Sequence, residues 1–234
     1  MSETFRRDLS FLEGAAESDI PVPRLTHLEA GNWRVNNSSI EAYSARAGGM
    51  GHPNGLVGLI GEQIGAENNN VGLDLAAGSN GEALRNLLDE GLIITGLMTN
   101  FEDHRSDAVR GDARLHHIAG NLVLAETWHT LLDWQEEYAP KGFAIVMHRP
   151  VGSLQDLPAT TYSGAAHLLL DRTRPNGLLF AQVPRPLAQP PARFRTLCAG
   201  LDTRQDVATI RIISMAHRGN PDKIDTHAVI TKRS

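Results

Sequence analysis

The chain has 234 residues, a formal net charge of −5 and 41% hydrophobic residues, which suffices for one large domain or for a domain with a cap. The net negative charge does not favour a surface for nucleic acid or anionic membrane. The single cysteine, Cys198, excludes an internal disulfide framework and is typical of a reducing compartment. We expect a cytoplasmic protein, since the first residues lack the apolar segment of a signal peptide and no run approaches the ~20 apolar residues of a membrane span.

The first 70 residues are predicted to form a helical cap. Pro21 and Pro23 exclude a long helix at the start, whereas helical spacing of apolar residues predicts a helix over 56–64. A glycine-rich loop over 48–55 precedes that helix, and a short helix is expected over 38–47. We interpret residues 1–70 as a cap that packs on a main domain over 71–234.

From residue 71 the chain alternates between predicted strands and helices, which favours an α/β, doubly wound and mostly parallel sheet. Two further β-branched segments are separated by a turn alone and therefore predict a C-terminal antiparallel hairpin, giving seven strands in all. The expected strands are 71–75, 92–98, 116–119, 143–147, 177–183, 207–214 and 226–231, and the expected helices are 82–90, 126–138, 162–171 and 190–201.

The stretch VGLDLAAGSNG, residues 71–81, combines a short apolar strand, a turn of small residues and the start of a helix. Small residues let a ligand approach the backbone, and a helix N-terminus presents unpaired N–H groups and a partial positive charge. Asp74, at the end of the strand, can accept hydrogen bonds. An ordinary strand–helix turn of any α/β domain is the alternative.

This stretch resembles motif I of the class I S-adenosylmethionine (SAM)-dependent methyltransferases, in which glycines follow an acidic residue at every second position. Asp74 and Gly78 fit the motif, whereas Ala76 and Asn80 replace glycines. The dinucleotide pattern GxGxxG is absent. The resemblance extends to the order of elements over 71–234 and implies a Rossmann-like methyltransferase fold, with SAM held by Asp74, Ala76, Gly78, Ser79 and Asn80.

The family usually has an acidic residue after the second strand, where it holds the ribose hydroxyls. Met98 occupies the simplest aligned position and cannot do so. FEDHR, residues 101–105, resembles an L-T-D-x-R pattern of some bacterial methyltransferases, which makes Asp103 the expected ribose ligand and Glu102 the reserve. The alternative is a solvated charged loop.

After the third strand the family often shows Gly-Asp, which accepts a hydrogen bond from the adenine amino group. Here the pair is Gly120-Asn121, and an amide oxygen can accept the same bond. Leu122 is expected to pack on the adenine face. The alternative is that Asn121 is simply a turn residue.

Residues 148–152, HRPVG, follow the fourth strand, where methyl acceptors lie in this fold, and resemble an R-P-x-G stretch of the same bacterial group. They are not the (D/N)PP(Y/F) motif of enzymes that methylate nucleic-acid amines, which argues against a base as the acceptor. His148 is the candidate general base and a cofactor contact, because imidazole titrates near neutral pH. Tyr43, Arg46 and Arg149 are expected to line the acceptor site. The alternative for His148 is a histidine that only lines the pocket or bonds to backbone.

No metal is expected, because neither HExxH nor CxxC spacing occurs and His116 and His117 should point to opposite faces of a strand. The sequence thus predicts an enzyme that transfers a methyl group from SAM to a small-molecule acceptor by in-line displacement, without nucleic-acid or membrane partners. A homodimer stays open. The alternatives are another nucleotide-using enzyme on this fold and a non-catalytic binding or assembly protein, since fold does not fix function.

Overall fold

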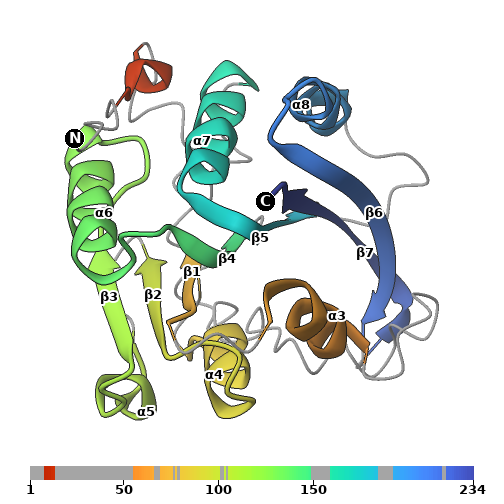
Figure 1. Cartoon of the computed structure of the whole chain (residues 1–234). Helices are drawn as coiled ribbons and strands as arrows, with labels where there is room; N and C mark the ends of the chain where they lie inside the picture. The colour runs from red at the N-terminus through yellow and green to blue at the C-terminus, as the bar shows by residue number, and fades with distance from the viewer. Residues whose placement is uncertain are drawn as a thin grey trace.

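The computed structural model describes residues 8–13, 55–65, 69–75, 77, 80–100, 103, 105–148, 159–183, 192–217 and 220–234 (Figure 1). The helices are η1 (Ser10–Leu12), α3 (Gly55–Ile64), α4 (Glu82–Asp89), α5 (Asp107–Arg110), α6 (Ala125–Tyr138), α7 (Ala159–Asp171) and α8 (Ala192–Asp202). The strands are β1 (Val71–Leu75), β2 (Thr95–Asn100), β3 (Leu115–Ala119), β4 (Phe143–His148), β5 (Thr173–Val183), β6 (Val207–His217) and β7 (Asn220–Lys232).

The strands form one seven-stranded sheet in the order β3-β2-β1-β4-β5-β7-β6. Neighbours among β1 to β5 are parallel, whereas β7 runs antiparallel to both β5 and β6. The predicted doubly wound sheet with a closing antiparallel hairpin is confirmed. Because β1 lies between β2 and β4, the direction of strand progression reverses there, and the carboxyl ends of these strands are where open α/β sheets bind ligands.

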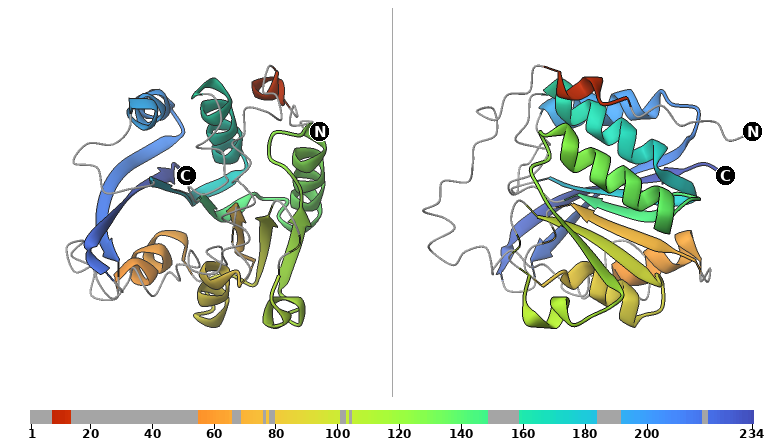
Figure 2. Two further views of the ribbon diagram at one scale, coloured as in Figure 1. Left: turned by 180° about the vertical axis from the view of Figure 1, so that it is seen from behind. Right: turned by 90° about the vertical axis from the view of Figure 1, so that its left-hand side faces the viewer.

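Helices cover both faces of the sheet (Figure 2). η1, α6, α7 and α8 lie on one face, and α3, α4 and α5 lie on the other. Each face has its own core. Val71, Leu73 and Leu75 pack on the α6–α7 side, so Gly72 and Asp74, which alternate with them, face the α4 side.

Helix α3 belongs to the core of the sheet, although it precedes residue 71. Its Ile60 and Ile64 are buried in the same apolar cluster as Ile145 and Phe180. The Arg174 guanidinium also donates to the Ile64 carbonyl at 2.5 Å, which fixes the end of α3 beside β5. Most of the predicted cap lies outside the described residues, so the division at residue 70 stays a prediction.

The strands β5 and β7 begin earlier than the sequence predicts. β5 starts at Thr173 and contains an irregularity, because Thr173 pairs with Phe143 while Leu178 pairs with Ile145. Asn176, inside it, has a φ of 59°, a conformation that asparagine tolerates. Residues 174–177, Arg-Pro-Asn-Gly, favour a turn by composition, but they lie within β5, where the register shift marks a bulge. The expected hairpin turn over 217–225 is likewise too long, since β6 runs to His217 and β7 begins at Asn220.

Two glycines let α4 lie close to the sheet. Gly72 of β1 and Gly96 of β2 are register partners on neighbouring strands. A Cβ at Gly72 would come within 2.9 Å of the Leu84 side chain, and one at Gly96 within 3.0 Å of it. Leu84, fully buried in α4, thus lies on a surface made by two residues without side chains. This contact sets the distance between α4 and the strands that precede it.

We predict that Gly72→Ala lowers the free energy of unfolding by about 1–3 kcal/mol, because the new methyl group overpacks the contact with Leu84. Urea denaturation measures the change. The loss caused by Gly72→Ala should be smaller when it is measured in a Leu84→Ala background than in the wild-type chain. Gly200→Ala, in helix α8, is the matched control. Its Cβ would lie 3.8 Å from Nε2 of His167 in α7, which is an ordinary contact, so stability should hold or rise. Equal losses in the two alanine variants would contradict the packing account.

Candidate functional site

The candidate site lies where β1, β2 and β3 end and α4 begins. Asp74 is the penultimate residue of β1, and its side chain is fully buried on the α4 face. Its register partners are Met98 in β2 and Met147 in β4, both buried. A carboxylate among such neighbours is costly unless it is bound to donors, so its retention at this strand end marks a polar site within the apolar core.

The backbone at the start of α4 packs closely against β2. Gly81, its N-cap, has a φ of 51°, and a Cβ at this position would meet Met98 Sδ at 3.3 Å. No side-chain hydrogen bond caps this helix end. Asn80, half-buried, directly precedes the glycine. The turn therefore presents an amide side chain and the positive end of α4 beside the end of β1.

Asp103 follows β2 and is tied to Arg105. Its two carboxylate oxygens accept from Nε and Nη2 of Arg105, each at 2.8 Å. This fork holds the pKa of Asp103 well below its usual range. Arg110 contributes a second cation, 3.9 Å from Oδ1. The side chain of Asp103 is 39% exposed, so the carboxylate is ionised, oriented and accessible.

Two residues that the sequence analysis did not select lie beside Asp103. Asn100, the last residue of β2, is buried, and its Nδ2 lies 3.4 Å from Nε2 of His117. Nδ1 of His117 lies 4.0 Å from Oδ1 of Asp103. Burial, the largest cause, lowers the pKa of His117. The sequence does show that Asn100 is a polar residue at the end of a mostly apolar segment. The charged FEDHR stretch that follows it was selected instead.

Asn121 and Leu122 both serve local structure after β3. Asn121 Oδ1 accepts from the backbone N–H of Val123 at 3.1 Å, which is the turn role that was weighed as the alternative. Leu122 is buried in the core of the α6 face, and its carbonyl accepts from Trp128 Nε1 at 2.7 Å. A carbonyl-type oxygen has two lone pairs, so the bond to Val123 leaves Asn121 one acceptor position. Contact of either residue with adenine stays a prediction.

His148 ends β4 level with Leu75 of β1 and Ala181 of β5, so its backbone lies at the same edge of the sheet as the other candidates. Its side chain is outside the described part of the structure. The remaining predicted site residues also lie outside the described residues, namely Tyr43, Arg46, Ala76, Gly78, Ser79, Glu102 and Arg149.

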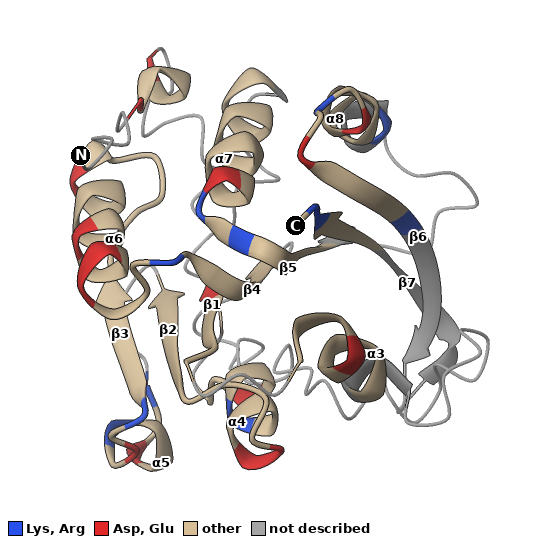
Figure 3. Ribbon diagram, in the orientation of Figure 1, with Lys and Arg blue, Asp and Glu red and all other residues tan. Residues whose placement is uncertain are grey.

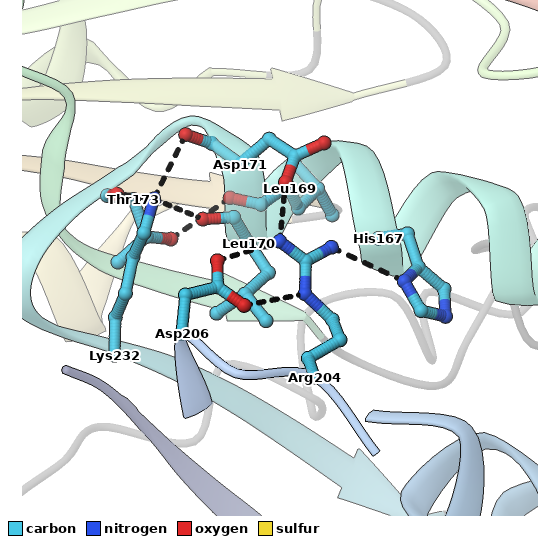
Figure 4. Close-up of polar contacts among 8 residues, drawn as sticks. All are labelled: His167, Leu169, Leu170, Asp171, Thr173, Arg204, Asp206 and Lys232. Atoms are coloured by element: carbon cyan, nitrogen blue, oxygen red, sulfur yellow. Dashed lines mark hydrogen bonds and ion pairs between the residues drawn. The ribbon is translucent and has the colours of Figure 1, made fainter. Parts of the chain in front are cut away.

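A second polar cluster, formed by His167, Asp171, Arg204, Asp206 and Lys232, lies at the opposite edge (Figure 4). Arg204 binds Asp206 through Nε at 2.8 Å and Nη2 at 2.6 Å, and Nη2 also reaches Asp171 at 2.5 Å. Lys232 Nζ donates to the carbonyls of Leu170, Asp171 and Thr173 at 2.7–3.1 Å. These bonds satisfy two C-terminal carbonyls of α7 and the first carbonyl of β5, and they fasten the end of β7 to both elements, which is a structural role.

The central strands carry few charged residues, whereas α4, α6 and the segment around α5 carry many (Figure 3). Within the described ranges no three His, Cys, Asp or Glu side chains lie close enough to hold a metal ion. His116 and His117 face opposite sides as expected, since the His116 ring contacts the rings of Trp134 and Tyr138 of α6 at tilted angles. A search of the described helices finds none that is long and apolar enough to cross a membrane.

Neither a protein-family model nor a curated protein matches this sequence. Solved structures do match its fold. A protein from Streptococcus mutans assigned as a SAM-dependent methyltransferase is 10% identical over 74% of this chain, with a TM-score of 0.50. A spermidine synthase bound to a transition-state analogue is 11% identical over 75% of the chain, also at 0.50. A magnesium protoporphyrin IX methyltransferase from Synechocystis with bound SAM is 12% identical over 76% of the chain and of its own length, at 0.49.

The two similarities with a TM-score of 0.50 show that the chain has the Rossmann-like fold of class I SAM-dependent methyltransferases, as the order of its elements had indicated. The chain spans only 47% of the Streptococcus protein and 61% of the spermidine synthase. Since one of the two is a synthase, the fold is shared by more than one activity.

The donors and acceptors at the candidate site fit a sulfonium nucleoside. Asp74, Asp103 and Asn100 place side-chain oxygens along the edge of β1 and β2, and Asn121 follows β3. The left-handed Gly81 keeps side-chain bulk away from the start of α4. The available residues are therefore compatible with SAM.

We predict that Arg105→Met raises the pKa of Asp103 toward its ordinary value of 3.8, because the fork that favours the ionised form is removed. NMR titration of the carboxyl carbon measures the change. Arg110→Met is the control and should raise this pKa much less, since its guanidinium lies 3.9 Å away. An Asp103 pKa that stays unchanged in Arg105→Met would refute the assignment of the fork.

We predict that Lys232→Met lowers the free energy of unfolding by about 2 kcal/mol, since charge-assisted bonds to the α7 carbonyls are lost. Guanidinium denaturation measures the loss. Because Lys232 lies at the sheet edge opposite the candidate site, ligand affinity at that site should be unchanged. A weaker affinity would show that the two edges are energetically linked.

Proposed function

We propose that the chain binds SAM at the ends of β1, β2 and β3 and transfers its methyl group to a small-molecule acceptor. The observation that supports this most strongly is the buried Asp74, placed on the α4 face next to the uncapped start of that helix, in a sheet with the order of a class I methyltransferase. The N-terminal residues, including Tyr43 and Arg46, would cover the acceptor, and a cytoplasmic location follows from the same proposal.

Each candidate has a separate part in holding the nucleoside. Asp74 would accept from the polar groups nearest β1, and the small-residue turn of Ala76, Gly78, Ser79 and Asn80 would leave room for backbone contact. Asp103 would accept from a ribose hydroxyl, because the fork from Arg105 keeps it ionised and fixed in orientation. Asn121 would accept from the adenine amino group beside Leu122.

When bound, SAM supplies a methyl group on a cationic sulfur, and the electron pair of the broken C–S bond returns to that sulfur. The protein then needs no strongly charged transition-state site. Its contribution is orientation of the two reactants and exclusion of water, worth up to about 7–11 kcal/mol in favourable cases. His148, at the end of β4, would accept the proton of an oxygen acceptor through its imidazole. Arg149, next to it in the chain, would orient the acceptor.

Isothermal titration with SAM and with its demethylated product tests the proposal. We expect Asp74→Asn to weaken binding roughly 10- to 100-fold, since a hydrogen bond to a charged group contributes about 1.5–3 kcal/mol. Lys232→Met is the control with an intact site. Unchanged affinity in Asp74→Asn, with the fold retained by circular dichroism, would contradict the placement of the cofactor.

A thermal-shift series with SAM, its demethylated product and NAD separates the competing functions. Stabilisation by the first two supports the proposal, because a ligand that binds only the native state raises its stability. Stabilisation by NAD alone would favour another nucleotide-using enzyme on this fold. No shift with any of the three would favour a non-catalytic protein that retains the fold.

A further inference from the structure

β6 (Val207–His217) is the last strand at one border of the sheet, and within the described part of the chain no strand pairs with its outer side. Arg211 is the only formally charged residue among its 11 residues, and the strand contains no proline. Residues 209–216 pair with β7 without irregularity, so the backbone groups on their outer side form a regular row of donors and acceptors. Proteins usually shorten, charge or bend such an edge, because it is a template for pairing with another chain.

β3 (Leu115–Ala119), at the other border of the sheet, has these protective features. It has only five residues, so it offers few backbone groups to another chain. Arg114, which directly precedes it, forms ion pairs with Asp112 and Asp89. The two borders of the sheet therefore differ, and β6 is the one suited to pairing.

Two copies of β6 can pair with each other in antiparallel orientation about a two-fold axis. Such a contact closes after two chains, because both copies use the same surface. Pairing of β6 with β3 of another copy would instead repeat without end. It would also leave most of β6 unpaired, because β3 is less than half as long. A second β6 is therefore the partner that fits this edge.

Helix α8 packs on β6 and carries a charge pattern that is complementary to itself. Gly200 marks the side of α8 that faces α7, since a Cβ there would lie 3.8 Å from Nε2 of His167. At about 100° per residue, Arg195 and Asp202 lie about 140–160° around the helix from Gly200, on the side away from α7 (Figure 1). Both side chains are exposed, and the exposed Ala199 lies between them on the same side of the helix.

A two-fold axis perpendicular to the sheet, through the paired β6 strands, also places the two α8 helices on the same face in antiparallel orientation. Arg195 of one copy then faces Asp202 of the other, and this contact occurs twice in the dimer. Ala199 lies between the two contacts, where a small side chain lets the helices approach. The strand edge supplies backbone hydrogen bonds, and the charges on α8 fix the register of the pairing.

We propose that β6 and the Arg195–Ala199–Asp202 side of α8 form the interface of a symmetric dimer of this chain. The two sheets then join into one sheet of 14 strands, seven from each copy. Because the two β6 strands are antiparallel, the carboxyl ends of the parallel strands point in opposite directions in the two copies. Each copy therefore keeps its own candidate site, and the inference does not depend on the binding of SAM.

Sedimentation equilibrium of the full chain tests the proposal. We expect a species with twice the mass of one 25.4-kDa chain. Asp202→Arg should raise the dissociation constant of the dimer roughly tenfold, since it replaces two attractive contacts by two repulsive ones. Arg195→Asp combined with Asp202→Arg should restore association, because the two charges are exchanged. Glu90→Arg is the matched control: it makes the same change of charge at the exposed end of α4, on the other face, and should leave association unchanged.

Amide hydrogen exchange at high and low protein concentration gives a second measurement on β6 itself. Alternate N–H groups of residues 209–216 point away from β7, so only the partner copy can protect them. Their protection should disappear on dilution below the dissociation constant, while the N–H groups that bond to β7 stay protected.

A monomer at every concentration would overturn the inference. A dimer whose association is unchanged by Asp202→Arg, or whose β6 exchange is unaffected by dilution, would equally overturn it, because the interface would lie elsewhere. None of these results bears on the proposed function, which the titration with SAM tests separately.

Discussion

The contact of Leu84 with the Gly72–Gly96 pair is the constraint on which the candidate site depends. Only residues without side chains allow α4 to lie this close to β1 and β2. That approach brings the start of α4, with its left-handed Gly81, beside the end of β1. A methyl group on either glycine would crowd the Leu84 side chain, which packs between α4 and these two strands. Packing at the middle of the strands thus fixes geometry at their ends.

Charged side chains have different roles at the two ends of the parallel strands. At the edge opposite the site, Arg204 forms ion pairs with carboxylates and Lys232 donates hydrogen bonds to backbone carbonyls (Figure 4). The donors of both side chains are therefore used within the fold. At the carboxyl edge, Asp103 keeps an exposed carboxylate, although Arg105 binds it, and Asn100 and His117 lie behind it. The first arrangement stabilises the chain, and the second leaves a carboxylate exposed at the proposed site.

The sequence predicted the order of elements well, because buried parallel strands such as 143–147 are continuous apolar runs and helices such as 126–138 keep their apolar spacing. It misjudged β5 and the β6–β7 turn, since proline and asparagine occur in bulges and antiparallel strand ends as well as in turns. Asp74 could be selected from motif spacing alone. The contact of His117 with Asn100 could not, because the two residues are 17 positions apart and meet only through strand pairing.

The central claim is that one nucleoside occupies the edge where β1, β2 and β3 end. Amide hydrogen exchange with and without saturating S-adenosylhomocysteine tests it most directly, since bound ligand suppresses local opening of the segments it touches. The account predicts added protection at residues 74–84, 99–105 and 117–123, and none around Lys232 and Arg204. Protection confined to the α7–β7 edge, or spread evenly over the sheet, would contradict the claim.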